Sequence, residues 1–168
     1  TFSRFVADNR DFFGLTKNAA EVLQLLCAVS TKTANQEDIP PFCSMSNARI
    51  AEKLTITLST VARSLKRLRD AGFVGLTVKG NGKRYTRRRE NLVLPGASYI
   101  DLSPLLERSR SEETYRKEID ARAFEHSDAK VQFADLLHSL SAFAEAHPDA
   151  VSGEMSDRLE VFKRMRIE

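Results

Sequence analysis

The sequence predicts a mainly α-helical fold that contains one small β-hairpin, and three observations support this class. Two short amphipathic segments between Ser46 and Gly72 have the spacing of helices joined by a tight turn. Strand-forming residues follow on both sides of Asn81-Gly82, a dipeptide typical of hairpin turns. Charge-rich, helix-forming sequence fills the chain beyond Ser103. These features predict a winged helix-turn-helix domain over residues 1–100 and a helical extension over residues 101–168.

The composition is that of a globular protein. The 168 residues are 42% hydrophobic and 29% charged, which is enough apolar sequence to form a core. No apolar run reaches the roughly 18 residues that a membrane helix needs, and no secretory leader is visible at the start. We therefore expect a cytoplasmic protein without a membrane partner. Because the chain begins with Thr1 rather than Met, we also expect it to be a piece of a longer protein.

The segments before Ser46 supply the first helices. SRFVADN near the start is predicted as a short helix. A longer helix should run from about Lys17 to Ser30, with Thr16 as its N-cap. Its buried face should contain the apolar residues that recur at helical spacing, Val22, Leu23, Leu25, Leu26 and Val29. The polar stretch TKTANQEDIPPF predicts a loop, and FCSM predicts a short edge strand.

Two further helices make up the helix-turn-helix. Ser46 is predicted to cap the first of them, whose buried side consists of Ile50, Ala51 and Leu54. Thr57 or Ser59 begins the second helix, and Gly72 ends it at a left-handed position. On a helical wheel, the apolar residues of the second helix share one narrow arc, Leu58, Val61, Leu65 and Leu68. We expect that arc to be buried.

The hairpin follows directly. Its strands are predicted over Phe73–Lys79 and about Lys83–Arg88, and they should pair with each other. Asn81-Gly82 supplies the positive φ values that a two-residue hairpin turn requires.

The sequence changes character after Pro95-Gly96. Ser103-Pro104 begins a long, charge-dense helix that should extend to around Phe124. Another helix is expected from about Asp128 to Ala146, where His147-Pro148 stops it, and a last one from Glu154 to Arg166. The second of these should bury several of its apolar residues, Val131, Phe133, Leu136, Leu137, Leu140 and Phe143. The extension is open to three roles: bracing the hairpin, forming a homodimer, or linking to a missing C-terminal domain.

Positive charge is concentrated in one block. Between Met45 and Leu92 there are twelve Lys and Arg residues but only three acids, a net charge of +9, whereas the rest of the chain carries −6. A polyanion-binding surface on an acidic body explains this asymmetry.

The helix after Thr57 has the pattern of a recognition helix. Opposite its apolar arc lie five polar or basic residues, Ser59, Thr60, Arg63, Lys66 and Arg67. Arg63 and Arg67 are one turn apart, and arginine can bind guanine through two parallel hydrogen bonds. The alternative is the solvated face of an ordinary helix, which is what most charged helix faces are. The neighbouring short helix and basic hairpin favour binding to duplex DNA.

The hairpin is predicted to be a phosphate-binding wing. Six cations surround its turn, Lys79, Lys83, Arg84, Arg87, Arg88 and Arg89. Cations this close repel one another unless an anion is present, and arginine suits phosphate. The alternative is a solubilising edge hairpin. The sequence thus predicts twelve DNA-contacting residues: Ser46, Asn47, Ser59, Thr60, Arg63, Lys66, Arg67, Lys79, Lys83, Arg84, Arg87 and Arg88.

No catalytic or metal site is predicted. His126, His138 and His147 have no companion cysteine at metal-ligand spacing. Cys27 and Cys43 make neither a disulfide framework nor a zinc site. Gly80-Asn81-Gly82-Lys83 lacks the glycine spacing of a phosphate loop. We therefore expect a non-enzymatic protein with no cofactor, metal or small-molecule ligand.

Three motifs in this order resemble the N-terminal domain of RepC, the replication initiators of repABC-type plasmids in alphaproteobacteria. They are Ser46-Asn47-Ala48, the run from Asn81 to Tyr85 with its trailing arginines, and Asp101-Leu102-Ser103-Pro104-Leu105. The resemblance spans roughly residues 12–125, departs at the polar loop Thr31–Asp38, and fades beyond Ser111.

The resemblance implies a bacterial, cytoplasmic protein that binds its plasmid's origin and starts replication, without enzymatic activity of its own. It implies recognition-helix positions at Ser59, Arg63 and Arg67 and wing positions at Lys83 and Arg84. A typical member continues into a second, C-terminal domain. Two alternatives stay open on the residues alone: a winged-helix transcriptional regulator whose last helices dimerise, and a protein-interaction module whose basic patch binds an acidic partner.

Overall fold

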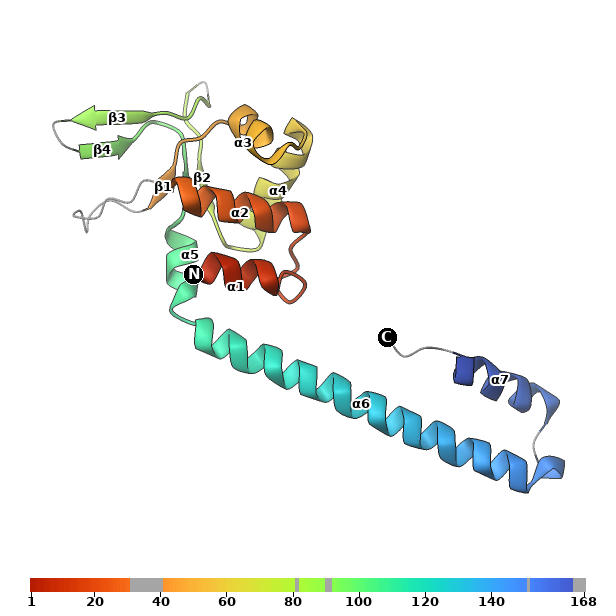
Figure 1. The fold of residues 1–168 in the computed structure, drawn as a ribbon. Helices are drawn as coiled ribbons and strands as arrows, with labels where there is room; N and C mark the ends of the chain where they lie inside the picture. Colours follow the sequence, from red (N-terminus) through yellow and green to blue (C-terminus); the bar gives the residue numbers. More distant parts are fainter. Residues whose placement is uncertain (31–40, 81, 90–91, 151, 165–168) are drawn as a thin grey trace. The chain divides into compact units, whose positions relative to one another are not determined.

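The computed structural model describes residues 1–30, 41–80, 82–89, 92–150 and 152–164. The chain divides into two compact units, which we call unit 1 (Thr1–Glu113) and unit 2 (Thr114–Glu168). The described residues are mainly helical with small antiparallel sheets, as expected from the sequence (Figure 1). The loop predicted at residues 31–40 lies outside the described residues. No described helix is both long and apolar enough to cross a membrane.

Five helices of unit 1 are described: α1 (Phe2–Asp8), α2 (Lys17–Val29), α3 (Asn47–Leu54), α4 (Leu58–Asp70) and α5 (Ser103–Ser109). Helix α2 packs against α1 on one side and α4 on the other, and α3 packs against α4. The core between them consists of fully buried apolar side chains, including Val6, Val22, Leu23, Leu26, Ile50, Val61 and Leu68. This burial confirms most of the apolar faces predicted for α2, α3 and α4.

Capping residues fix where these helices begin. The side chains of Thr16, Ser46 and Thr57 each accept a hydrogen bond from the backbone N–H three residues later, at 3.2–3.3 Å. Helix α4 is followed by Gly72, whose φ of +71° is the left-handed value expected of a glycine at this place. The predicted caps are therefore confirmed.

The predicted apolar arc of α4 is wrong at one position. Leu58 is 57% exposed, whereas Ser64 is buried beside Val61, Leu65 and Leu68. Leu58 is the first residue of the helix, on the edge of the buried arc. A serine can take the buried position because its side chain is small.

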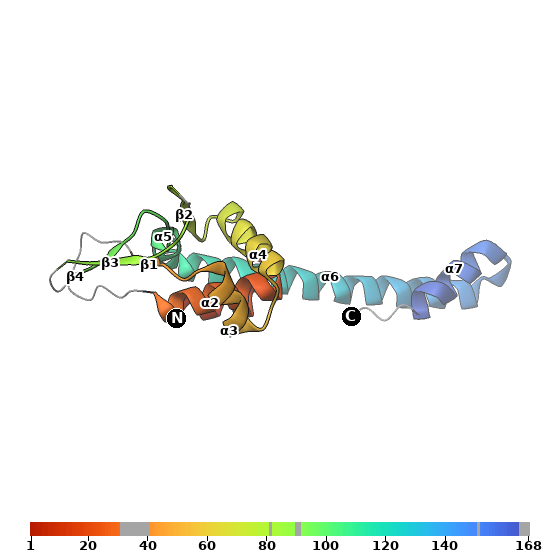
Figure 2. The ribbon, with the colours of Figure 1, turned by 90° about the horizontal axis from the view of Figure 1, so that it is seen from above.

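A three-stranded antiparallel sheet adjoins the helices. Its order is β1 (Phe42–Cys43), β5 (Tyr99–Asp101) and β2 (Gly75–Thr77), so the edge strand predicted at FCSM is confirmed. A separate two-stranded sheet is formed by β3 (Thr86–Arg89) and β4 (Leu92–Pro95). Figures 1 and 2 both show this β3–β4 hairpin projecting away from α4.

The strand pairing predicted around Asn81-Gly82 is wrong. Strand β2 pairs with β5 and strand β3 pairs with β4, so the two predicted strands are not partners. The reason is non-local: Ile100 of β5 is fully buried opposite Leu76, and the Ser98 hydroxyl both donates to the Lys79 carbonyl and accepts from the Lys79 N–H. Gly82 has the positive φ expected of the turn, whereas Asn81 lies outside the described residues.

Helix α5 begins at Ser103 as predicted, with Pro104 in its first turn. The Asp101 carboxylate accepts hydrogen bonds from the Ser103 N–H and hydroxyl, at 2.9 and 2.7 Å. The helix ends at Ser109, so its predicted extension to Phe124 is wrong. Arg108 donates to the Ala71 carbonyl and lies over the Phe73 ring, which ties α5 to the end of α4.

Unit 2 consists almost wholly of helix. Helix α6 runs from Glu112 to Ala146, a 3-10 turn follows at Pro148–Ala150, and α7 spans Gly153–Arg164. The break predicted between Phe124 and Asp128 is wrong, because Glu125-His126-Ser127 contains no glycine or proline to interrupt the helix. The stop predicted at His147-Pro148 is confirmed. The last two residues of the predicted final helix, 165 and 166, lie outside the described residues.

The burial predicted for α6 is also wrong. None of its side chains is buried, and Leu137 is only half-buried. The other five residues are exposed: Val131, Phe133, Leu136, Leu140 and Phe143. Within unit 2, one short helix, α7, covers α6, and Leu159 is its buried apolar residue. A single helix of this length cannot cover a 35-residue neighbour.

Candidate nucleic-acid interface

Helix α4 presents the polar face that the sequence predicted. Ser59, Arg63, Lys66 and Arg67 are exposed, and Thr60 is half-buried. The opposite side of α4 is anchored in the core, so these side chains are held on a rigid element. At its N-terminus the Thr57 hydroxyl lies 2.9 Å from those of Ser59 and Thr60. The result is a hydroxyl-rich helix start followed by a basic flank, which suits phosphate and base contacts.

The start of α3 lies near this face, but both residues predicted there have structural partners. The Ser46 hydroxyl caps α3 by accepting from the Arg49 N–H. The Asn47 side-chain oxygen accepts a hydrogen bond from the Arg84 guanidinium. This bond spans 37 residues of sequence and joins the segment after Gly82 to α3.

Arg84 is the least exposed cation of the predicted set that the structure describes. It is half-buried, and its Nη1 is buried with no hydrogen-bond partner among the described residues. Burial lowers the pKa of Arg84, and the nearby Cys43 thiol acts in the opposite direction. An arginine stays charged in either case. Arg84 thus holds a half-buried positive charge against the start of α3.

Lys66 connects the grooves around α4. One groove, with a volume of about 440 Å³, runs between α4 and the segment after β2 and is lined by Asn47, Lys66, Arg69 and Arg84 among others. A second groove, also of about 440 Å³, is lined by Lys66 with Arg63 and Arg67. Five cations line these two grooves, which share Lys66, and we call the surface that they form the α4 face: Arg63, Lys66, Arg67, Arg69 and Arg84.

The remaining predicted cations are divided between two places. Lys79 and Lys83 are exposed on the segment between β2 and β3 that leads to Arg84. Arg87 is exposed on β3, which projects away from α4 in both ribbon views (Figures 1 and 2). Arg88 is its neighbour on the strand, and its side chain lies outside the described residues. Arg87, the hairpin cation whose side chain the structure describes, is thus not part of the α4 face.

Two basic residues that the sequence reasoning counted but did not select also border these grooves. Arg69 lies on the flank of α4 that faces Arg84, three residues after Lys66, and it pairs with Asp70 at 3.4 Å. Arg49 lines a third groove, of about 470 Å³, with Ser44, Ser46 and Arg84. Helical spacing from Lys66 would have found Arg69. No sequence signal marked Arg49, because its position depends on how Arg84 folds back.

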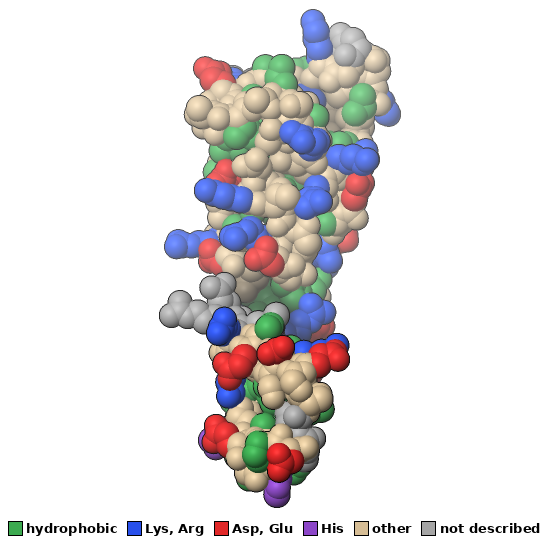
Figure 3. Space-filling model, turned by 90° about the vertical axis from the view of Figure 1, so that its right-hand side faces the viewer, with side chains coloured by type: hydrophobic (Ala, Val, Ile, Leu, Met, Phe, Trp, Pro, Cys, Tyr) green, Lys and Arg blue, Asp and Glu red, His purple; other side chains and the backbone are tan. Residues whose placement is uncertain are grey.

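The space-filling view shows where charge gathers on unit 1. The upper part of Figure 3 shows the side of unit 1 that carries α3 and α4, and more Lys and Arg (blue) than acidic side chains (red) lie on it. No cluster of three or more His, Cys, Asp or Glu that would hold a metal ion occurs among the described residues.

A family model described as the Replication protein C N-terminal domain matches residues 2–147. The chain belongs to this family. Membership in the Replication protein C family implies a role as a plasmid replication initiator, which agrees with the resemblance found in the sequence. No match was found among curated proteins or among solved structures.

Proposed function

We propose that unit 1 is a winged helix-turn-helix domain that binds duplex DNA at a plasmid replication origin and so takes part in starting replication. The observation that carries the proposal is the α4 face, a cationic surface on a helix whose other side is anchored in the core. The family supplies the biological setting, because a replication initiator must find its origin.

The order of elements supports the winged-helix assignment. Strand β1, helices α3 and α4, and strands β2 and β5 follow one another, and the three strands form one antiparallel sheet. The long connection between β2 and β5 is the wing in this proposal, and it includes the β3–β4 hairpin.

Helix α4 is the element that enters the major groove. Arg63 and Lys66 project from its exposed side, where a side chain can reach base edges, and Ser59 and Thr60 at its start suit phosphate. Arg67, Arg69 and Arg49 flank these residues and would contact the two sugar–phosphate strands.

The wing contacts the DNA backbone through its exposed cations. Lys79 and Lys83 lie on the part of the wing that leads to the α4 face. Arg87, together with Arg88 from its sequence position, would reach a neighbouring stretch of the duplex. Arg84 acts differently: its bond to Asn47 fixes the wing against α3, and so both residues position the surface.

The proposed action is binding without catalysis. In this view the domain is a cytoplasmic, non-enzymatic component whose partner is double-stranded DNA. Neither a cofactor nor a small-molecule ligand is part of the proposal.

The test is fluorescence anisotropy with the whole chain, a labelled duplex from the origin of its own plasmid, and a scrambled duplex of equal length. Binding should prefer the origin and weaken steeply between about 50 and 200 mM salt, because phosphate contacts release counterions. Lys66→Ala should reduce the affinity and the salt dependence, whereas Arg158→Ala, which removes an exposed charge from α7, should change neither.

Two results would contradict the proposal. Absence of salt-sensitive binding at micromolar protein favours a module that binds an acidic protein. Binding to the origin together with failure of the intact protein to support replication of an origin plasmid, while it represses a promoter, favours a transcriptional regulator on the same fold.

A further inference from the structure

Unit 2 exposes an unusual number of large apolar side chains. On α6 these include Leu136, Leu140 and Phe143, with exposed fractions of 63, 47 and 53%. On α7, Met155 and Phe162 are exposed as well. An exposed row of this kind on one helix marks an interaction surface.

The row follows the 3-4 spacing of a coiled coil. Along α6, residues recur in alternating steps of four and three at 115, 119, 122, 126, 129, 133, 136, 140 and 143. Seven of these nine positions are apolar, and Arg122 and His126 are the exceptions. We call this row the α6 seam. Such a repeat keeps one stripe of a long helix in contact with a second helix that runs alongside it.

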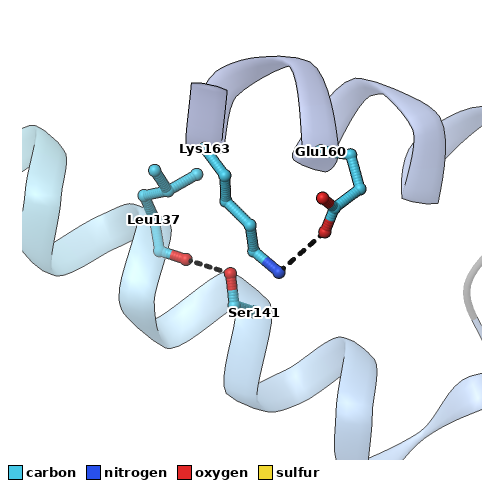
Figure 4. A network of polar contacts seen from close by, with 4 residues as sticks. All are labelled: Leu137, Ser141, Glu160 and Lys163. Carbon is cyan, nitrogen blue, oxygen red and sulfur yellow. Dashed lines mark hydrogen bonds and ion pairs between the residues drawn. The ribbon is translucent and has the colours of Figure 1, made fainter. Parts of the chain in front are cut away.

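Helix α7 covers only one flank of the α6 seam. The Phe162 ring meets the Phe133 ring edge-on at a centroid distance of 6.2 Å. Figure 4 shows Glu160 and Lys163 of α7 facing the stretch of α6 that contains Leu137 and Ser141, and both of those α6 residues are half-buried. The seam residues Leu136, Leu140 and Phe143 remain exposed, so part of the seam is uncovered.

The charges on the two borders of the α6 seam indicate which helix can pair with it. In the heptad, Glu118 and Glu125 precede the seam positions Ile119 and His126, so the acids lie on one border. Lys130 follows Ala129, which places a base on the opposite border, as Arg116 does after Tyr115. When two copies of α6 run parallel and in register, Glu125 of each copy faces Lys130 of the other, five residues further along. Antiparallel copies would instead place the two acidic borders against each other.

We propose that the α6 seam is a homodimer interface in which two copies of α6 pair as a parallel coiled coil. The second copy is the occupant that matches both the length of the seam and the charges on its borders. In register, Glu125 of one copy faces Lys130 of the other. Arg122 and His126 are polar seam positions, which lower stability but restrict pairing to one register. The dimer would carry two α4 faces in one particle, as proteins that bind repeated DNA sites often do.

The test measures mass in the absence of DNA, so that it is independent of the proposed DNA binding. Size-exclusion chromatography with light scattering, over a range of micromolar concentrations of the whole chain, should show a dimer of twice 18.9 kDa. Leu136→Glu with Leu140→Glu should raise the dimer dissociation constant by about tenfold or more, because the charges would be buried in the seam.

Phe124→Glu with Val131→Glu is the matched control. These two residues are 73 and 57% exposed on the side of α6 away from the seam, so the same change in charge should leave the dimer intact. Circular dichroism of each variant checks that α6 and α7 remain helical.

A charge exchange tests the orientation. Glu125→Lys should weaken the dimer, and adding Lys130→Glu should restore it, because the parallel pair is rebuilt with its signs reversed. A dimer that Glu125→Lys strengthens would contradict the parallel arrangement. A wild-type chain that stays monomeric at every concentration overturns the proposal, as does a dimer that Leu136→Glu with Leu140→Glu does not weaken.

Discussion

Units 1 and 2 differ in the burial of their apolar side chains. In unit 1, the apolar faces of α2, α3 and α4 meet one another, and residues such as Leu23, Ile50 and Leu68 are fully buried. In unit 2, α6 has no buried side chain although its apolar residues recur at helical spacing. The same periodicity thus marks a core where helices fold back on each other and a surface where they do not. Unit 1 completes its own core, whereas unit 2 leaves apolar side chains exposed.

Truncation of an apolar side chain should show the largest difference between the two units, measured as the loss of unfolding free energy. Leu68→Ala is expected to cost about 2–5 kcal/mol of unfolding free energy, because it leaves a cavity in a fully buried site. Val131→Ala on α6 should change it by no more than about 0.5 kcal/mol, because the residue is exposed. Urea denaturation followed by circular dichroism measures both. Equal losses would mean that α6 is packed as tightly as α4.

DNA affinity should depend on cations of unit 1 alone. Arg63→Ala is expected to weaken binding to the origin duplex by about 1–3 kcal/mol and to relax base preference if the guanidinium reads a base. Arg67→Ala is tested by the same measurement, anisotropy on origin and random duplexes. An equal loss on both duplexes would make the residue a phosphate contact. No loss of affinity on either duplex would mean that the residue does not contact DNA.

The contact between Asn47 and Arg84 should behave as a pair. In a double-mutant cycle, Asn47→Ala and Arg84→Ala should show a coupling of about 0.5–3 kcal/mol, because each change removes the same hydrogen bond. Both stability and DNA affinity can be followed in the four proteins. Additive effects on both would show that the wing is not held to α3 through this bond.

A helix cap should give a smaller effect. Thr57→Ala removes the acceptor for the Thr60 N–H at the start of α4 and should cost about 1 kcal/mol of stability. Thr57→Ser, which keeps the hydroxyl, is the control and should retain most of it. Thermal unfolding of the two variants side by side makes the comparison.

The smallest expected effect concerns the reactivity of the two thiols of unit 1. Burial raises the pKa of both Cys27 and Cys43, so little reactive thiolate forms near pH 8. Both should react slowly with a disulfide reagent in the folded protein and rapidly after unfolding. Fast reaction of Cys43 in the native chain would show that the core around β1 opens readily.

Local sequence rules were sufficient to predict much of unit 1. Thr16, Ser46 and Thr57 could be predicted as caps and Gly72 as a helix end because each acts on backbone groups within a few residues. The polar side of α4 followed from its periodicity in the same way. Periodicity did not predict that the DNA contacts would be divided between the α4 face and the β3–β4 hairpin. That division depends on how the wing folds.

The errors concern contacts between distant parts of the sequence. Strand β5 is only three residues long, so nothing local showed that Ile100 would take the place beside β2. The half-buried position of Arg84 could not be predicted, because its bond to Asn47, 37 residues earlier, has no local signal. On α6, apolar spacing predicted burial, but spacing does not reveal whether the partner belongs to the same chain.

A footprint of the chain on its own plasmid tests the central claim most directly. If the α4 face binds the origin, a discrete stretch of origin DNA should be protected from nuclease at protein concentrations that leave the rest of the plasmid open to cleavage. Arg63→Ala with Lys66→Ala should abolish that protection. Uniform protection of the whole plasmid, or protection at the origin that survives the double substitution, would contradict the account.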